Sequence, residues 1–75
     1  MLLSYQEIRK TIVYENIENV KPEKHDSLMK DLKDRTGLNI HRIEIGRIDF
    51  LRDTARIRIF YFEEGGRSLK NEVDV

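Results

Sequence analysis

Apolar and polar residues alternate most regularly over residues 54–62. The odd positions carry the apolar side chains of Ala55, Ile57, Ile59 and Tyr61. Successive side chains of a strand point to opposite faces, so a period of two predicts a strand here. Its second face carries the even positions, which are Arg56, Arg58, Phe60 and Phe62.

The pattern over residues 39–50 predicts a strand that forms a hairpin with residues 54–62. In this strand the apolar residues switch from odd to even positions. They are odd before residue 46 and even after it: Ile43 and Ile45, then Ile48 and Phe50. A strand keeps its faces across such a change only if one residue is inserted as a β-bulge. Gly46 and Arg47 lie at the change, and we expect Gly46 to adopt the positive φ that glycine tolerates.

The bulge gives a register in which apolar side chains meet throughout the hairpin. In this register Gly46 and Arg47 both oppose Arg58, and residues 51–54 form the loop. Without the bulge, no register pairs all of the apolar residues. The expected apolar pairs are Ile43 with Tyr61, Ile45 with Ile59, Ile48 with Ile57, and Phe50 with Ala55.

A strand and then a helix are predicted before the hairpin. Residues 8–17 contain a run of β-forming residues, and Pro22 suits the first turn of a helix, where its missing N–H is not needed. Gly37 suits the left-handed position that ends a helix. Between them, one apolar stripe at a spacing of i, i+3, i+4 and i+7 is formed by His25, Leu28, Met29 and Leu32.

The order strand, helix, strand, strand predicts a split β-α-β unit of the α+β class, half of a ferredoxin-like fold. A right-handed crossover makes the first two strands parallel. The third strand is the most apolar and therefore belongs in the middle, which gives the sheet order 1-3-2. We expect one domain over residues 8–62 and a flexible polar tail over residues 63–75. The single helix covers one face and leaves Phe60 and Phe62 on the other.

The composition narrows the classes of function. The chain has 75 residues and no cysteine, which excludes a disulfide framework and a thiolate zinc site. Fourteen basic and fourteen acidic residues cancel, whereas a nucleic-acid-binding arm carries a positive excess. No apolar run approaches the roughly 20 residues of a membrane span. We expect no cofactor and no nucleic-acid partner.

Two stretches resemble a known family: RTGL at residues 35–38 and IEIGRIDFLRDTARIRIFY at residues 43–61. The second is similar to the C-terminal cytoplasmic segment of multi-span bacterial membrane proteins of unknown function. These proteins are often encoded beside proteins resembling polyphosphate polymerases of the vacuolar-transporter-chaperone type. The residues before them, KTIVYENIENVKPEKHDSLMKDLKDRTGL, resemble the strand and helix that precede that segment.

The resemblance implies a location and partners. It implies a domain at the cytoplasmic face of the bacterial inner membrane, as part of a larger protein whose membrane spans are missing here. The membrane portion of that protein, and possible contact with a polyphosphate-polymerase-like protein, are the implied partners. The resemblance supplies no catalytic residues. We therefore expect a non-enzymatic domain that acts in assembly or regulation.

The histidines and serines do not predict a metal site or a nucleophile. A zinc site needs three or four converging ligands, and His25 on the helix is expected far from His41 at the start of a strand. The serines lie in the first residues, on the polar side of the helix and in the tail. No nucleophile-elbow glycines surround them.

Asp49 and Asp53 are the best-placed carboxylates. An acid–base couple needs two such groups that converge in a cleft with separated pKa values. The expected register instead places Asp49 opposite Arg56 across the hairpin. Asp53 is expected to accept backbone N–H bonds in the loop, so both residues are interpreted as structural.

The arginines are the one cluster of chemical interest. Arginine presents a planar fork that matches phosphate, so a phosphate-rich ligand is the alternative function. The competing interpretation is a solvated face on which carboxylates neutralise the arginines. RNA binding on the aromatic residues would require a fold twice this size. The candidate anion or partner face consists of Arg42, Arg47, Arg56, Arg58, Phe60 and Phe62.

An open sheet face also predicts self-association. Burying a phenylalanine side chain stabilises a complex by about 1.5–3 kcal/mol. With Phe60 and Phe62 in water, a symmetric homodimer is expected. The contact would be face to face, or edge to edge through the outer strands.

Overall fold

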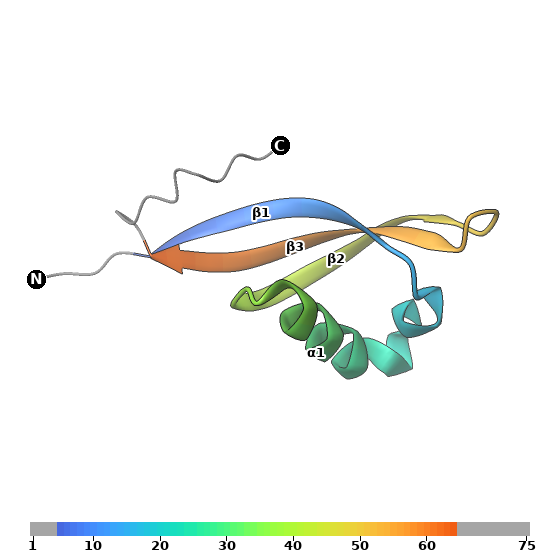
Figure 1. Ribbon diagram of the computed structural model, residues 1–75, viewed down its shortest axis with the longest axis horizontal. Helices are drawn as coiled ribbons and strands as arrows, with labels where there is room; N and C mark the ends of the chain where they lie inside the picture. The colour runs from blue at the N-terminus through green and yellow to red at the C-terminus, as the bar shows by residue number, and fades with distance from the viewer. Residues whose placement is uncertain (1–4, 65–75) are drawn as a thin grey trace, which may run out of the picture.

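The computed structural model describes residues 5–64 as three strands, two short 3₁₀ turns and one helix (Figure 1). The strands form one sheet in the order β1-β3-β2, and both outer strands run antiparallel to β3. The expected α+β class and the sheet order 1-3-2 are confirmed. The elements are β1 (Tyr5–Tyr14), η1 (Ile17–Val20), η2 (Pro22–Lys24), α1 (His25–Thr36), β2 (Ile40–Asp49) and β3 (Thr54–Glu64).

β1 lies three residues earlier than the sequence pattern indicates, and β3 is longer than its pattern indicates. β1 runs over Tyr5–Tyr14, not over residues 8–17, because the chain turns into η1 soon after Tyr14. β3 continues through Glu63 and Glu64, which were expected in the tail. Backbone pairing between the two strands extends both of them beyond the apolar run. The rest of the expected tail, residues 65–75, lies outside the described residues.

The helix begins and ends close to where the sequence predicts. Pro22 lies in η2, directly before α1. Gly37 ends α1 with a φ of 72°, and its N–H donates to the carbonyl of Lys33 at 2.9 Å. Leu28 is buried as expected, whereas His25 is exposed at the first turn and does not join the apolar stripe.

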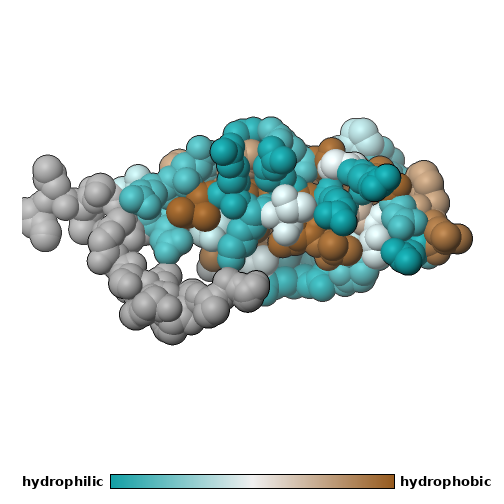
Figure 2. Space-filling model, turned by 90° about the horizontal axis from the view of Figure 1, so that it is seen from above, coloured by the Kyte–Doolittle hydropathy of each residue, from teal (hydrophilic) through white to brown (hydrophobic). Residues whose placement is uncertain are grey.

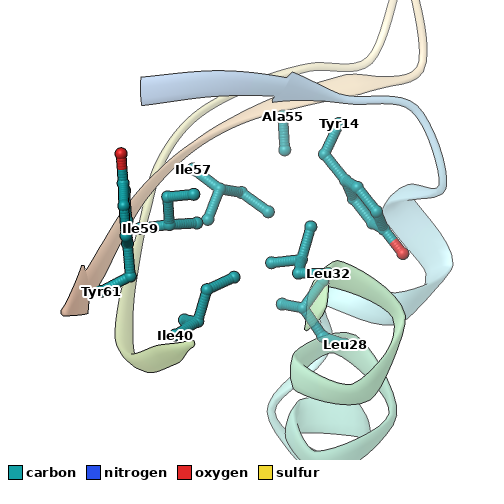
Figure 3. Packing of buried hydrophobic residues seen from close by; sticks show 8 residues of the cluster. All are labelled: Tyr14, Leu28, Leu32, Ile40, Ala55, Ile57, Ile59 and Tyr61. Atoms are coloured by element: carbon teal, nitrogen blue, oxygen red, sulfur yellow. The ribbon is translucent and has the colours of Figure 1, made fainter. Parts of the chain in front are cut away.

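The core lies between α1 and one face of the sheet (Figure 3). The odd positions of β3 supply its centre, as the alternation predicts. The helix contributes two leucines, and each outer strand contributes one buried residue. The buried cluster consists of Tyr14, Leu28, Leu32, Ile40, Ala55, Ile57, Ile59 and Tyr61.

The β-bulge is in the predicted place, but the register of the hairpin is wrong by two residues. Ile45 pairs with Ile57 and Ile48 pairs with Ala55, so the extra residue lies opposite Arg56 instead of Arg58. A slip of two residues preserves parity, so the side chains from Arg42 to Asp49 keep their faces. A second shift follows Ile40.

The turn explains the register. The strands end at Asp49 and Thr54, which pair with each other, so the loop is residues 50–53 and not 51–54. Asp49 accepts hydrogen bonds from two backbone N–H groups of the loop, at 3.0 and 3.1 Å. Asp53 has a φ of 56°, a conformation that aspartate tolerates better than most residues. This local chemistry closes the hairpin one residue earlier than apolar pairing suggests.

Gly46 does not have the positive φ that we expected. Within residues 5–64, positive φ occurs at Gly37 and Asp53. A Cβ atom at position 46 would lie 3.3 Å from the carbonyl oxygen of Arg56. Glycine is therefore needed at position 46 because the two strands approach closely at the bulge, and not because the backbone is left-handed.

Candidate interaction surface

The open face is the sheet face opposite α1, and its two phenylalanines differ in exposure. Phe60 is only 3% exposed, with the guanidinium carbon of Arg42 3.8 Å from its ring centre. Phe62 is 39% exposed and stacks on His41, with 4.3 Å between ring centres. The expectation that both rings lie in water is therefore wrong for Phe60.

Carboxylates neutralise part of the arginine cluster. Glu44 lies 2.8 Å from Arg42 and 3.8 Å from Arg58. Glu7 on β1 lies 2.7 Å from His41. This part of the open face matches the competing interpretation, a solvated face with alternating charge.

The remaining arginines gather at the hairpin end, which we define as residues 45–56. Arg47 and Arg56 form no ion pair with the described residues, and Arg52 reaches Asp49 at 3.9 Å. The structure thus separates the six candidate residues into two groups. A surface hollow at the hairpin end is lined by Val13, Arg47, Ile48, Asp49, Phe50, Arg52, Thr54 and Arg56.

Asp49 does not pair with Arg56 as expected. It pairs with Thr54 in the sheet, and its carboxylate faces the loop. Asp53 is exposed, and its backbone conformation is its contribution to the turn. The Asp49 carboxylate therefore stabilises the loop and not a cross-strand pair. The expected role of the Asp53 carboxylate as an acceptor stays a prediction.

A polar network that sequence patterns do not reveal joins β1 to α1. The hydroxyl of Tyr14 donates to Asp31 at 2.5 Å and accepts from Asn19 at 3.1 Å. Burial, and then the hydrogen bond to Asp31, raise the pKa of Tyr14 above its ordinary value of 10.0. Residues 17 positions apart meet here, and no local spacing predicts such a contact.

Arg35 extends this network to the surface. It lies 2.8 Å from Glu15 and 3.4 Å from Asp31. Hydrogen bonds from the Glu15 backbone and from Arg35 lower the pKa of the Glu15 carboxyl. The hydrogen bond to Glu15 in turn raises the pKa of Arg35.

The sequence pattern also did not predict the exposed apolar apex of the hairpin. Phe50, expected opposite Ala55, is in the loop and 76% exposed, and Leu51 is 91% exposed. The available signal was two consecutive apolar residues beside a turn. The register that pairs apolar residues places Phe50 in the sheet opposite Ala55, and it therefore does not predict that Phe50 is exposed.

The histidines lie apart. His25 is on the exposed first turn of α1, and His41 is on the open face beside Glu7. Within residues 5–64, no three histidine or acidic side chains converge as a metal site requires. Across the same residues, α1 has neither the length nor the apolar composition of a membrane span.

The fold and its polar surfaces define a small α+β domain with one covered and one open sheet face. The chain belongs to the family DUF4956, a domain of unknown function, whose model matches residues 1–61. No curated protein and no solved structure matches the chain. The match confirms membership of a family of unknown function, as the resemblance implied.

Proposed function

We propose that this domain is a non-enzymatic assembly module that forms a homodimer through the free edge of β1. The observation that carries this proposal is the difference between the two outer strands. β1 pairs with β3 over ten residues without a break in register. β2 is interrupted by two register shifts, and bulges are a common way to block pairing at an edge. β1 is therefore the better edge for a second copy.

The open face supports a face-to-face dimer less well. Arg42 already covers Phe60, and His41 covers one side of Phe62. Around these two rings, little apolar area remains for a partner to bury. The proposed contact is therefore edge to edge and extends the sheet from three strands to six.

Charge favours one register for the dimer over its neighbours. In a symmetric antiparallel pair with both helices on the same side, one residue of β1 lies opposite its own copy. Placing Ile8 at this centre puts Glu7 opposite Arg9 twice, on the open face. Centres at Glu7, Arg9 or Lys10 instead place a charge opposite its own copy, which is unfavourable.

The register gives a charge-swap experiment. Arg9→Glu and Glu7→Arg each place like charges in contact, and each is expected to weaken the dimer at least about tenfold. The double variant restores the opposite charges and should restore the dimer. Lys33→Glu, on the exposed side of α1, is the matched control.

Sedimentation or light scattering over a concentration series measures the mass. A mass twice the 9.0 kDa of one chain is expected for the native protein and the double variant. A constant monomer mass at all concentrations contradicts the proposal. If both single variants form the dimer as strongly as the native protein, the proposed register of β1 is wrong.

We further propose that this module works at the cytoplasmic face of a bacterial membrane protein, in assembly or regulation. The similarity of residues 43–61 to such a segment supports this location. The membrane portion of a parent chain and a polyphosphate-polymerase-like protein are the proposed partners. Co-purification of tagged full-length protein from membranes tests both.

A phosphate-rich ligand is the second candidate function. It is favoured by Arg47 and Arg56, which lack carboxylate partners among residues 5–64, unlike Arg42 and Arg58. Binding of inorganic polyphosphate should weaken steeply with salt, whereas edge pairing should change little. Binding that survives Arg47→Gln with Arg56→Gln contradicts this candidate.

A further inference from the structure

Exposed apolar residues concentrate at the hairpin end. Figure 1 shows the β2–β3 hairpin continuing past α1, so no helix covers its final residues. Figure 2 shows hydrophobic atoms gathered at the right-hand end of the molecule, which is this end of the sheet. Of the seven exposed large hydrophobic residues within residues 5–64, four belong to the hairpin end: Ile45, Ile48, Phe50 and Leu51. A fifth, Val13 of β1, lines the same hollow.

Phe50 and Leu51 form the apex of this projection. They are consecutive residues of the loop, and they are the two most exposed large hydrophobics in residues 5–64. Asp49 fixes the loop through its two backbone hydrogen bonds. The apolar side chains are therefore presented by an ordered turn, and their exposure is a property of the fold.

Arginines surround the apex. Arg47, Arg52 and Arg56 line the same hollow as Phe50. Asp49 also lines this hollow, where it accepts two backbone hydrogen bonds and lies 3.9 Å from Arg52. Asp53 is exposed in the loop, so the three arginines exceed the nearby carboxylates by one. Long arginine stems can lie along an apolar surface while their guanidinium groups stay in water or on phosphates.

We propose that the hairpin end inserts Phe50 and Leu51 into the interface of a bilayer that contains anionic phospholipids, with the three arginines on the lipid phosphates. A convex apex suits a fluid interface, which adapts to its shape, whereas a protein partner would need a matching pocket. Aromatic side chains favour this depth, and each basic residue near an anionic surface adds attraction. The proposal extends the membrane location given under the proposed function.

A single tryptophan reports the insertion. The chain contains no tryptophan, so Phe50→Trp provides a unique fluorophore at the apex. With vesicles of phosphatidylcholine and phosphatidylglycerol, its emission should shift to the blue. Vesicles of phosphatidylcholine alone should give a much smaller shift. Tyr5→Trp, at the opposite end of the sheet, is the matched control and should not shift.

Vesicle sedimentation then measures affinity. Replacing Phe50 and Leu51 by serine should weaken binding to the anionic vesicles by about tenfold or more. Exposed loop residues leave the core intact, and circular dichroism verifies this. Equal binding by the double serine variant overturns the proposal.

Other outcomes identify other occupants. A blue shift of Phe50→Trp that follows protein concentration without vesicles assigns the apex to a second copy and overturns the proposal. A shift produced equally by soluble polyphosphate assigns the arginines to a free polyanion and also overturns it. The mass measurement on β1 variants uses no vesicles, so failure of the dimer and failure of membrane insertion remain distinguishable.

Discussion

Arg42 lies directly opposite Phe60 on the neighbouring strand, with its guanidinium carbon 3.8 Å from the ring centre. Glu44 holds the same guanidinium at 2.8 Å. The arginine thus covers a ring that would otherwise face water, and it keeps its charge at the surface. Side chains of the same chain thus cover part of the open face, and this supports the proposal that a second copy binds at the edge of β1.

The Arg42–Phe60 contact should be measurable as a coupling energy. A double-mutant cycle with Arg42→Gln and Phe60→Leu is expected to give about 0.5–2 kcal/mol in the free energy of unfolding. Urea denaturation provides the four stabilities. The cycle of Arg58→Gln with Phe60→Leu is the control and should give a smaller coupling. Equal couplings would mean that Arg42 does not stack on the ring.

Tyr14 should make stability depend on pH above 10. Its pKa is raised from 10.0 in the folded protein, so the folded state holds this proton more tightly than the unfolded state. Stability is therefore complete below pH 10 and falls as the pH rises toward the folded-state pKa. Thermal melts of native protein and Tyr14→Phe from pH 8 to 11 should show a steeper fall in the native protein.

Tyr14→Phe should also lower stability at neutral pH. It removes a hydrogen bond to a carboxylate, which is worth about 1.5–3 kcal/mol. Tyr61→Phe is the control, since its hydroxyl carries none of these hydrogen bonds. An unchanged pH profile in Tyr14→Phe would remove the assigned role of this hydroxyl.

Gly37 and Gly46 should respond differently to substitution. At Gly37, with φ of 72°, alanine should cost about 1–2 kcal/mol, and asparagine should cost less because it tolerates this conformation. At Gly46 the obstacle is the Arg56 carbonyl, so asparagine should be no better than alanine. Chemical denaturation of the four variants tests this contrast. If asparagine is as costly as alanine at position 37, strain is not the reason for glycine there.

Asp49 should stabilise the turn without help from Arg56. Asp49→Ala removes both loop hydrogen bonds and is expected to destabilise by about 0.5–2 kcal/mol, as loss of a capping side chain does. Asp49→Asn keeps the acceptor oxygen and should retain most of the stability. A cycle with Arg56→Gln should show no coupling; a coupling near 1 kcal/mol would restore the cross-strand ion pair that the sequence suggested.

Periodicity determined most of the residues that face the core, but it also assigned His25 and Phe50 to it, and both are exposed. The alternation over residues 54–62, the helical stripe through Leu28 and the glycine at position 37 each depend on neighbours in the chain. These local signals predicted the elements, the sheet order 1-3-2 and the position of the bulge. The family resemblance also rested on short stretches of sequence, residues 35–38 and 43–61.

Only the tertiary structure decided the register and the contacts that follow from it. A slip of two residues leaves every apolar side chain on its own face, so the hydrophobic pattern cannot detect it. The loop hydrogen bonds of Asp49 and a second shift after Ile40 selected the actual pairing. That pairing places Arg42 over Phe60 and moves Phe50 from the sheet to the exposed apex. The contact of Tyr14 with Asp31 likewise depends on where the crossover sets the helix, which no short window of sequence contains.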